Sequence, residues 1–163
     1  MELRGPDSRF RSAGEDVGVA NHMTTRYGGL QGDFALSLMR FRDQTLDDMD
    51  QIFRRVVIEI GSAVIRLSPV DTGRFRGNWQ FTVDEPASAS LDNYDKEGHD
   101  TIARLIAGVQ HLTFGQTAYI VNNLVYGVPL EYGHSNQAPT GMVRITLDGF
   151  NQMVDEAVRE VTQ

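Results

Sequence analysis

Cysteine is absent from this 163-residue chain, which excludes disulfide bonds, thiolate metal ligands and thiol nucleophiles. Lysine occurs once, at Lys96, so 14 of the 15 basic residues are arginine. No run of residues approaches the roughly 20 apolar positions of a membrane-spanning helix. The first residues also lack the apolar core of a secretory signal. These absences predict a soluble globular chain with no membrane partner.

Acidic residues outnumber basic ones by 22 to 15, giving a net charge of -7. Nucleic acid is therefore a poor candidate for a partner held by attraction, because phosphate binding needs a basic surface. Residues 1–42 carry six arginines against five acids, whereas the remainder carries nine basic residues against 17 acids. Arginine suits paired contacts at protein interfaces. A GC-rich genome produces the same bias, and composition does not separate the two explanations.

Residues 1–33 are rich in glycine and show no sustained apolar period, which predicts an extended N-terminal arm held by contacts outside its own core. Apolar residues then alternate over 34–38, and we expect a short strand there. A long helix is predicted over 45–67, with Thr45 as its cap, because apolar residues recur at three- and four-residue steps. Pro69 follows its end.

Two further strands are predicted, over 77–83 and 117–121. The segment 84–100 contains six acids and one base, and we expect an exposed loop. Asp100 is the expected cap of a helix reaching Val109, and the last helix is expected from Thr140 to residue 161. The predicted fold is α+β: residues 34–163 form one domain, with a small antiparallel sheet packed against the long central helix and the C-terminal helix.

Nucleotide-binding loops, serine nucleophile elbows and zinc-protease helices have no match in the sequence. Glu131 and His134 come nearest to a metal-ligand pair, but Pro129 and Gly133 argue against the regular helix that such a pair needs. We therefore expect neither a metal nor a cofactor.

The triplet Asp71-Thr72-Gly73 matches the catalytic tripeptide of aspartic proteases. That chemistry needs two aspartates sharing a proton, so one copy per chain would require a homodimer. The alternative is a turn in which Asp71 accepts a local backbone hydrogen bond and Gly73 adopts a positive φ. We favour the turn, because the triplet follows Pro69 rather than a buried strand.

Three segments resemble, in order, motifs of the tail-completion or neck proteins of tailed bacteriophages. They are SPVDTGRFRGNW at 68–79, YIVNNLVY at 119–126 with LEYG at 130–133, and HSNQAPTGMVR at 134–144. The resemblance covers about residues 33–160. Members of the family usually begin near Met23 or Phe34, so residues 1–22 are interpreted as an extra arm or a misassigned start.

The resemblance implies a structural virion protein rather than an enzyme. It would form a homo-oligomeric ring between the DNA-filled head and the tail, with a sixfold ring favoured and a twelvefold ring left open. The ring would contact neighbouring connector and tail proteins after assembly in the host cytoplasm, and DNA would pass through it without sequence-specific binding. Two alternatives stay open: a homodimeric aspartic protease using Asp71, and an acidic adaptor that binds a basic host protein.

Within this hypothesis, five residues of the motif segments are predicted to lie at interfaces, since Tyr and Arg are frequent interface anchors. They are Arg74, Arg76, Tyr126, Glu131 and Tyr132. Asp92, Asp95 and Glu97 of the acidic loop are predicted to line the channel, where carboxylates would repel DNA phosphates. A solvated loop on the outside of the ring is the alternative.

Overall fold

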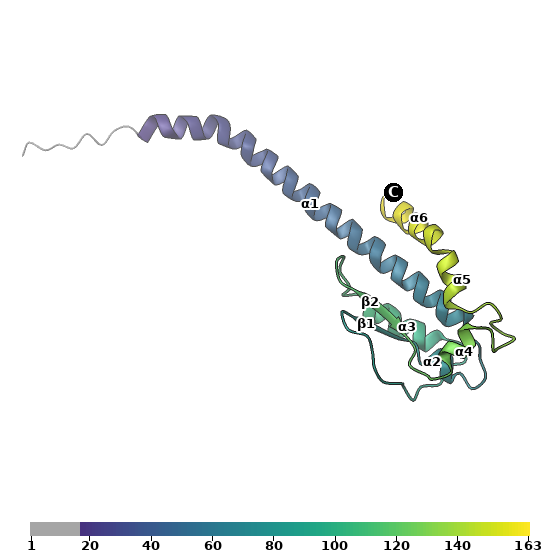
Figure 1. Ribbon diagram of the computed structural model, residues 1–163. Coiled ribbons are helices and arrows are strands. Elements are labelled where there is room, and N and C mark those ends of the chain that lie inside the picture. The colour runs from purple at the N-terminus through teal and green to yellow at the C-terminus, as the bar shows by residue number, and fades with distance from the viewer. Residues whose placement is uncertain (1–16) are drawn as a thin grey trace, which may run out of the picture. The chain divides into compact units, whose positions relative to one another are not determined.

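The computed structural model describes the backbone from Val17 to Gln163 and the side chains from Gly32 onward. Helices and a small antiparallel sheet are mixed along the chain, as the sequence predicts (Figure 1). In chain order the elements are α1 (Val17–Leu67), α2 (Arg74–Gly77), β1 (Gln80–Val83), α3 (His99–Val109), β2 (Ala118–Val121), α4 (Gly127–Glu131), α5 (Val143–Asp148) and α6 (Phe150–Val161).

The chain divides into two units, one ending at Asp43 and one running from Gln44 to Gln163. In the first unit, the described side chains from Gly32 to Asp43 are all exposed. The second unit contains the hydrophobic core, to which α1 contributes Val57, Val64 and Ile65. This boundary lies further along the chain than the one expected after residue 33.

The core joins α1 to the segment that follows it, as the apolar period of 45–67 and the position of Trp79 predict. Its other buried members come from α2, α3 and the later loops: Phe75, Leu105, Val109, Leu112, Leu124, Ala138 and Met142. Each large apolar side chain removed from water in this way contributes about 1.5–3 kcal/mol before entropy is counted. The core therefore depends on contacts between segments far apart in the sequence.

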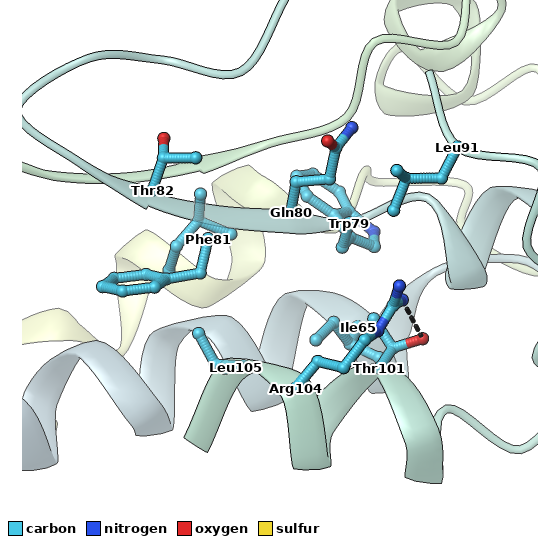
Figure 2. Close-up of a pocket in the computed structure, with 10 residues that line it drawn as sticks. Ile65, Trp79, Gln80, Phe81, Thr82, Leu91, Thr101, Arg104 and Leu105 are labelled. Atoms are coloured by element: carbon cyan, nitrogen blue, oxygen red, sulfur yellow. Dashed lines mark hydrogen bonds between the residues drawn. The ribbon is translucent and has the colours of Figure 1, made fainter. Parts of the chain in front are cut away.

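The sheet consists of β1 and β2, paired antiparallel from Gln80 opposite Val121 to Val83 opposite Ala118. Successive side chains of a strand point to opposite faces. Figure 2 shows this alternation, with Phe81 on the side of the sheet where Leu105 of α3 lies and Thr82 on the other side. Phe81 and Val83 pack against the buried core, as their spacing predicts.

Two predictions for α1 are wrong. Residues 34–38 belong to the helix and form no strand, and Thr45 lies within the helix instead of capping it. A short apolar run does not distinguish a strand from a helix, and Phe34, Leu38 and Phe41 also fit a helical period. The N-terminal arm expected over 1–33 is described from Val17, where it is helical, and residues 1–16 lie outside the described residues.

The helix expected from Thr140 to residue 161 is divided into α5 and α6 at Gly149. The Gly149 N–H donates to the carbonyl of Thr146, three residues back, at 3.2 Å, which tightens the last turn of α5. Helix α5 begins at Val143 rather than at Thr140. The turn-rich stretch 125–133 also contains the short helix α4.

Candidate functional site

The first motif segment turns the chain after α1. Gly73 has φ +88, in agreement with the predicted positive φ, and it precedes α2. The local hydrogen bond that we expected at Asp71 is made by its neighbour instead: the N–H of Arg74 donates to Thr72 Oγ1 at 3.3 Å. The side chain of Asp71 is exposed, next to this turn.

Side-chain amides connect the three motif segments. Gln137 of the third segment accepts a hydrogen bond from the N–H of Val70 at 2.8 Å and donates one to the carbonyl of Val70 at 2.9 Å. Asn122 of the second segment donates through Nδ2 to the carbonyl of Phe75 at 2.8 Å. The segments that are separate in the sequence therefore meet around the first motif.

An open cavity of about 230 Å3 lies where these segments meet. The rings of Phe75 and Tyr126 pack with centroids 5.8 Å apart at this place. The lining includes both ends of the first motif's turn and parts of the other two segments: Pro69, Val70, Asp71, Thr72, Gly73, Arg74, Phe75, Tyr126, Leu130, Ser135 and Gln137. We call this region the motif surface.

Glu131, predicted as an interface residue, is occupied within the chain. Its carboxylate accepts hydrogen bonds from the N–H groups of Met142 and Val143, both at 2.9 Å, and of Arg144 at 3.0 Å. Burial raises the pKa of Glu131, but these hydrogen bonds outweigh that effect and hold the pKa below its ordinary value. The carboxylate thus caps the start of α5 from eleven or more residues away in sequence.

Arg76, the second interface candidate of the first segment, is also used internally. Its guanidinium donates to the carbonyls of Lys96 at 2.6 Å, Ser68 at 2.8 Å and Arg66 at 3.0 Å. These contacts fasten the end of α1 to the acidic loop. The geometry makes Arg76 a structural cross-link, because its hydrogen-bonding capacity is directed inward.

Three of the five predicted interface residues present their side chains to solvent. Arg74 is exposed, Tyr126 is partly exposed, and Tyr132 is 68% exposed. The guanidinium of Arg144 lies 5.1 Å from the centre of the Tyr132 ring, an arrangement that holds this aromatic side chain in place. The motif surface therefore displays Arg74 and Tyr126, whereas Tyr132 is exposed outside its lining residues.

The three predicted channel residues of the acidic loop differ in their exposure to solvent. Asp95 is only 7% exposed, and its carboxylate accepts from the N–H of Gly98 at 2.7 Å and from the N–H and Oγ1 of Thr101 at 2.9 and 2.8 Å. Asp95 thus caps α3 in place of the expected Asp100. Asp92 and Glu97 are exposed.

Buried Asp95 is not placed to line a channel, because its charge is enclosed by the chain's own donors. Burial raises its pKa, but the hydrogen bonds from Thr101, Gly98 and Asp100 outweigh this and bring the pKa below 3.8, its ordinary value. The prediction for the loop then concerns Asp92 and Glu97.

Candidate metal and catalytic residues do not assemble. Among the described residues, no group of three or more histidine and carboxylate side chains is placed to hold a metal ion. The carboxylate of Glu131 accepts hydrogen bonds from the α5 backbone, while His134 Nδ1 lies 2.9 Å from the carbonyl oxygen of Pro129. An aspartic-protease pair would need the exposed Asp71 of a second copy.

The structure contains an apolar groove that we did not predict from the sequence. An open apolar groove of about 670 Å3 lies along α1, between α6 and β2. Helices α1 and α6 lie side by side (Figure 1). Arg55 of α1 forms an ion pair with Glu160 of α6 at 3.2 Å. The groove, called here the α1–α6 groove, is lined by Met49, Ile52, Phe53, Val56, Val57, Ile60, Phe114, Gln116, Thr117, Ala118, Ile120, Phe150 and Val154.

The apolar period of 45–67 does signal this surface, but periodicity does not distinguish a residue buried in the core from one that lines an open groove. In the described part of the chain, no helix combines the length and the apolar character required to cross a bilayer. Comparison of the chain with known protein families, with curated proteins and with solved structures finds no match.

Proposed function

We propose that this chain is a structural subunit of the neck of a tailed bacteriophage, where it joins the DNA-filled head to the tail as part of a ring around the DNA channel. The observation that carries the proposal is the motif surface. Three sequence segments that resemble neck-protein motifs fold onto one another through the Gln137–Val70 and Asn122–Phe75 hydrogen bonds.

The chemistry of the motif surface supports a contact with protein rather than a reaction. Arg74 and Tyr126 are exposed there, and Tyr132 is exposed elsewhere in the second motif segment. Tyr and Arg are enriched among residues that dominate interface energies. Glu131 and Arg76 of the same segments are half-buried, and their hydrogen bonds within the chain hold the surface in shape. A neighbouring connector or tail protein, or a second copy of the chain, is the partner expected there.

The channel part of the proposal assigns Asp92 and Glu97 to the lumen. A ring of carboxylates repels DNA phosphates, and this repulsion weakens with salt because the Debye length is about 8 Å near physiological ionic strength. Replacing both residues with arginine is expected to slow DNA ejection from virions, most strongly at low salt. The exposed Asp148, replaced in the same way, serves as the control, and normal ejection by the double variant would place the loop outside the ring.

Two measurements test the proposal as a whole. Native mass spectrometry of the purified chain should give a closed oligomer, with a hexamer favoured over a dodecamer. Antibodies against the chain should label the head–tail junction of virions in electron micrographs, and removal of its gene should leave filled heads that lack tails. Label on the capsid surface or on no particle at all would contradict the proposal.

One variant distinguishes the homodimeric protease from the neck subunit. Asp71→Asn removes the carboxylate on which that chemistry depends, so it should abolish any pepstatin-sensitive cleavage of a peptide library. We expect no such cleavage by the unaltered chain. Detection of it, with loss in Asp71→Asn, would favour the protease over the neck subunit.

A further inference from the structure

Strand β2 has a neighbouring strand on one side only within the described part of the chain. In an antiparallel pair, residues that exchange backbone hydrogen bonds with the partner strand alternate with residues whose N–H and C=O groups point away from it. The N–H of Asp84 donates to the carbonyl of Thr117 at 2.8 Å, in the register of the β1–β2 pairing. Every second residue from Thr117 onward therefore bonds to β1, and the residues between them, Ala118 and Ile120, direct their backbone groups to the free edge.

The free edge of β2 lacks the features that usually protect such an edge. The structure gives the outward N–H and C=O groups of Ala118 and Ile120 no hydrogen bond to another described segment. Soluble proteins shield an edge of this kind with proline, with charged side chains or with a covering segment. The sequence of β2 is Ala-Tyr-Ile-Val, without proline or charge. The edge is therefore suited to pairing with a further strand.

The α1–α6 groove borders this free edge. Its lining includes Thr117, Ala118 and Ile120 but no residue of β1, so the groove lies on the side of β2 away from β1. A residue in a packed strand occupies about 160 Å3, given a rise of about 3.4 Å, a strand spacing of about 4.8 Å and a sheet separation of about 10 Å. The volume of the groove, about 670 Å3, therefore matches about four strand residues, which is the length of β2.

We propose that the α1–α6 groove is a docking position for a strand, which an extended segment of a partner protein occupies by pairing with the free edge of β2. The partner's backbone bonds to Ala118 and Ile120, and every second side chain of the partner enters the apolar groove. A partner helix uses its own backbone groups internally and would leave those of β2 unpaired. The groove shares no lining residue with the motif surface, and the inference does not rest on the proposed function.

Charge defines one end of the partner segment. Asp84 and Glu85 are exposed, and the Asp84 carboxylate accepts the N–H of Thr117, where the chain enters β2, at 3.1 Å. Residues 113–126, which contain β2, carry no charge that would offset these acids. A complementary partner therefore carries lysine or arginine at the end that lies beside Asp84. The proposed partner is thus an extended segment with alternating apolar residues and a basic end.

A second copy of the chain fits this description poorly. Its β1 strand ends in the same two acids, so like charges would meet at the acidic end of the groove. The outward carbonyl of Val83 in β1 also accepts the N–H of Glu85 at 2.8 Å, so it is already paired. The free edge of β2 in a second copy is bordered by that copy's own α6, through Phe150 and Val154. Two such edges would have to open both grooves before they could pair.

Hydrogen exchange in the full-length chain tests whether the edge is open. In a dilute sample, the N–H groups of Ala118 and Ile120 should be at least about tenfold less protected than those of Tyr119 and Val121, which bond to β1. Equal protection of all four would mean that the chain covers its own edge. Protection of Ala118 and Ile120 that appears only at high protein concentration would assign the groove to a second copy. Either result overturns the proposal.

Peptide selection tests the chemistry of the partner. Random peptides of about ten residues are selected on the full-length chain and counter-selected on Ala118→Pro, which removes one outward N–H. Enriched peptides should alternate apolar residues, carry lysine or arginine at one end, and slow exchange at Ala118 and Ile120 by about tenfold or more when bound. Failure to enrich any peptide, or enrichment of peptides that bind as helices or without alternation, contradicts the proposal.

A second pair of variants covers the case in which Ala118→Pro does not fold. Val154→Asp places a charge in the groove without altering β2 and should raise the dissociation constant of the selected peptides by about tenfold or more. Val158→Asp is the matched control, because Val158 lies on the same helix outside the groove lining, and it should leave that constant within about twofold. Circular dichroism checks that both variants are folded. Equal binding to the two variants overturns the proposal.

Discussion

The indole Nε1–H of Trp79 donates a 2.7 Å hydrogen bond to Oγ of Ser68, whose own hydroxyl donates to the carbonyl of Val64 at 2.8 Å. Both residues are buried. This chain of hydrogen bonds fixes the only tryptophan against the end of α1 and supplies the partner that a buried indole requires.

Ser68→Ala should lower the free energy of unfolding by about 1–3 kcal/mol, because it leaves the indole N–H unpaired in the core. Urea denaturation followed by the emission of Trp79 measures this change. Ser90→Ala, at an exposed position of the acidic loop, should cost less than about 0.5 kcal/mol. Equal midpoints for the two variants would show that the hydrogen bond contributes nothing measurable.

Gly73→Ala should destabilise the chain by at least about 2 kcal/mol. The residue has φ +88, and an added Cβ would lie 2.7 Å from the backbone N of Lys96. Gly115→Ala is the matched control, since Gly115 has φ +100 but no neighbouring atom within 4 Å of an added Cβ. It should cost only the conformational strain, about 1 kcal/mol. Similar urea midpoints for both would mean that the first turn tolerates the crowding.

Asp95→Asn should change how stability depends on pH. The folded-state pKa of Asp95 is lowered below 3.8, so its charge stabilises the fold above that pH and this contribution is lost as the pH falls through the folded-state pKa. At neutral pH, the variant should be about 1 kcal/mol or more less stable than the unaltered chain, through loss of the charged cap. The difference should shrink in acid.

Unfolding free energies measured from about pH 2 to pH 7 check this expectation. Asp92→Asn is the control, because Asp92 is exposed and belongs to the same loop. A gap between Asp95→Asn and the unaltered chain that stays constant down to the lowest pH would contradict the role assigned to the charge.

Glu131→Gln should loosen the start of α5. One amide oxygen cannot replace the two carboxylate oxygens that accept from Met142, Val143 and Arg144, so we expect a loss of about 1–3 kcal/mol. Hydrogen exchange at these three N–H groups should accelerate. Glu156→Gln, which alters an exposed hydrogen bond to Gln152 on α6, should leave their exchange unchanged.

The caps of α3 and α5 could be identified only from the structure. Local spacing suggested Asp100 as a helix cap and Thr140 as the start of the last helix. Instead, α3 is capped by Asp95 of the preceding loop, and α5 is capped by Glu131 of α4. When the capping carboxylate comes from a residue distant in sequence, the residues at the start of the helix carry no capping pattern. For the same reason, the internal hydrogen bonds of Glu131 and Arg76 could not be predicted from the sequence.

The sequence by itself determined the α+β class, the end of α1 before Pro69 and the joint burial of Trp79 with the apolar side of α1. It also placed the two strands, predicted over 77–83 and 117–121 and found over 80–83 and 118–121. These follow from local periodicity and from the backbone limits of proline and glycine, which act within a few residues. Tertiary structure decided the rest. It alone buried Asp95 while leaving Asp92 exposed, and it left the α1–α6 groove open, because burial depends on which distant segments meet.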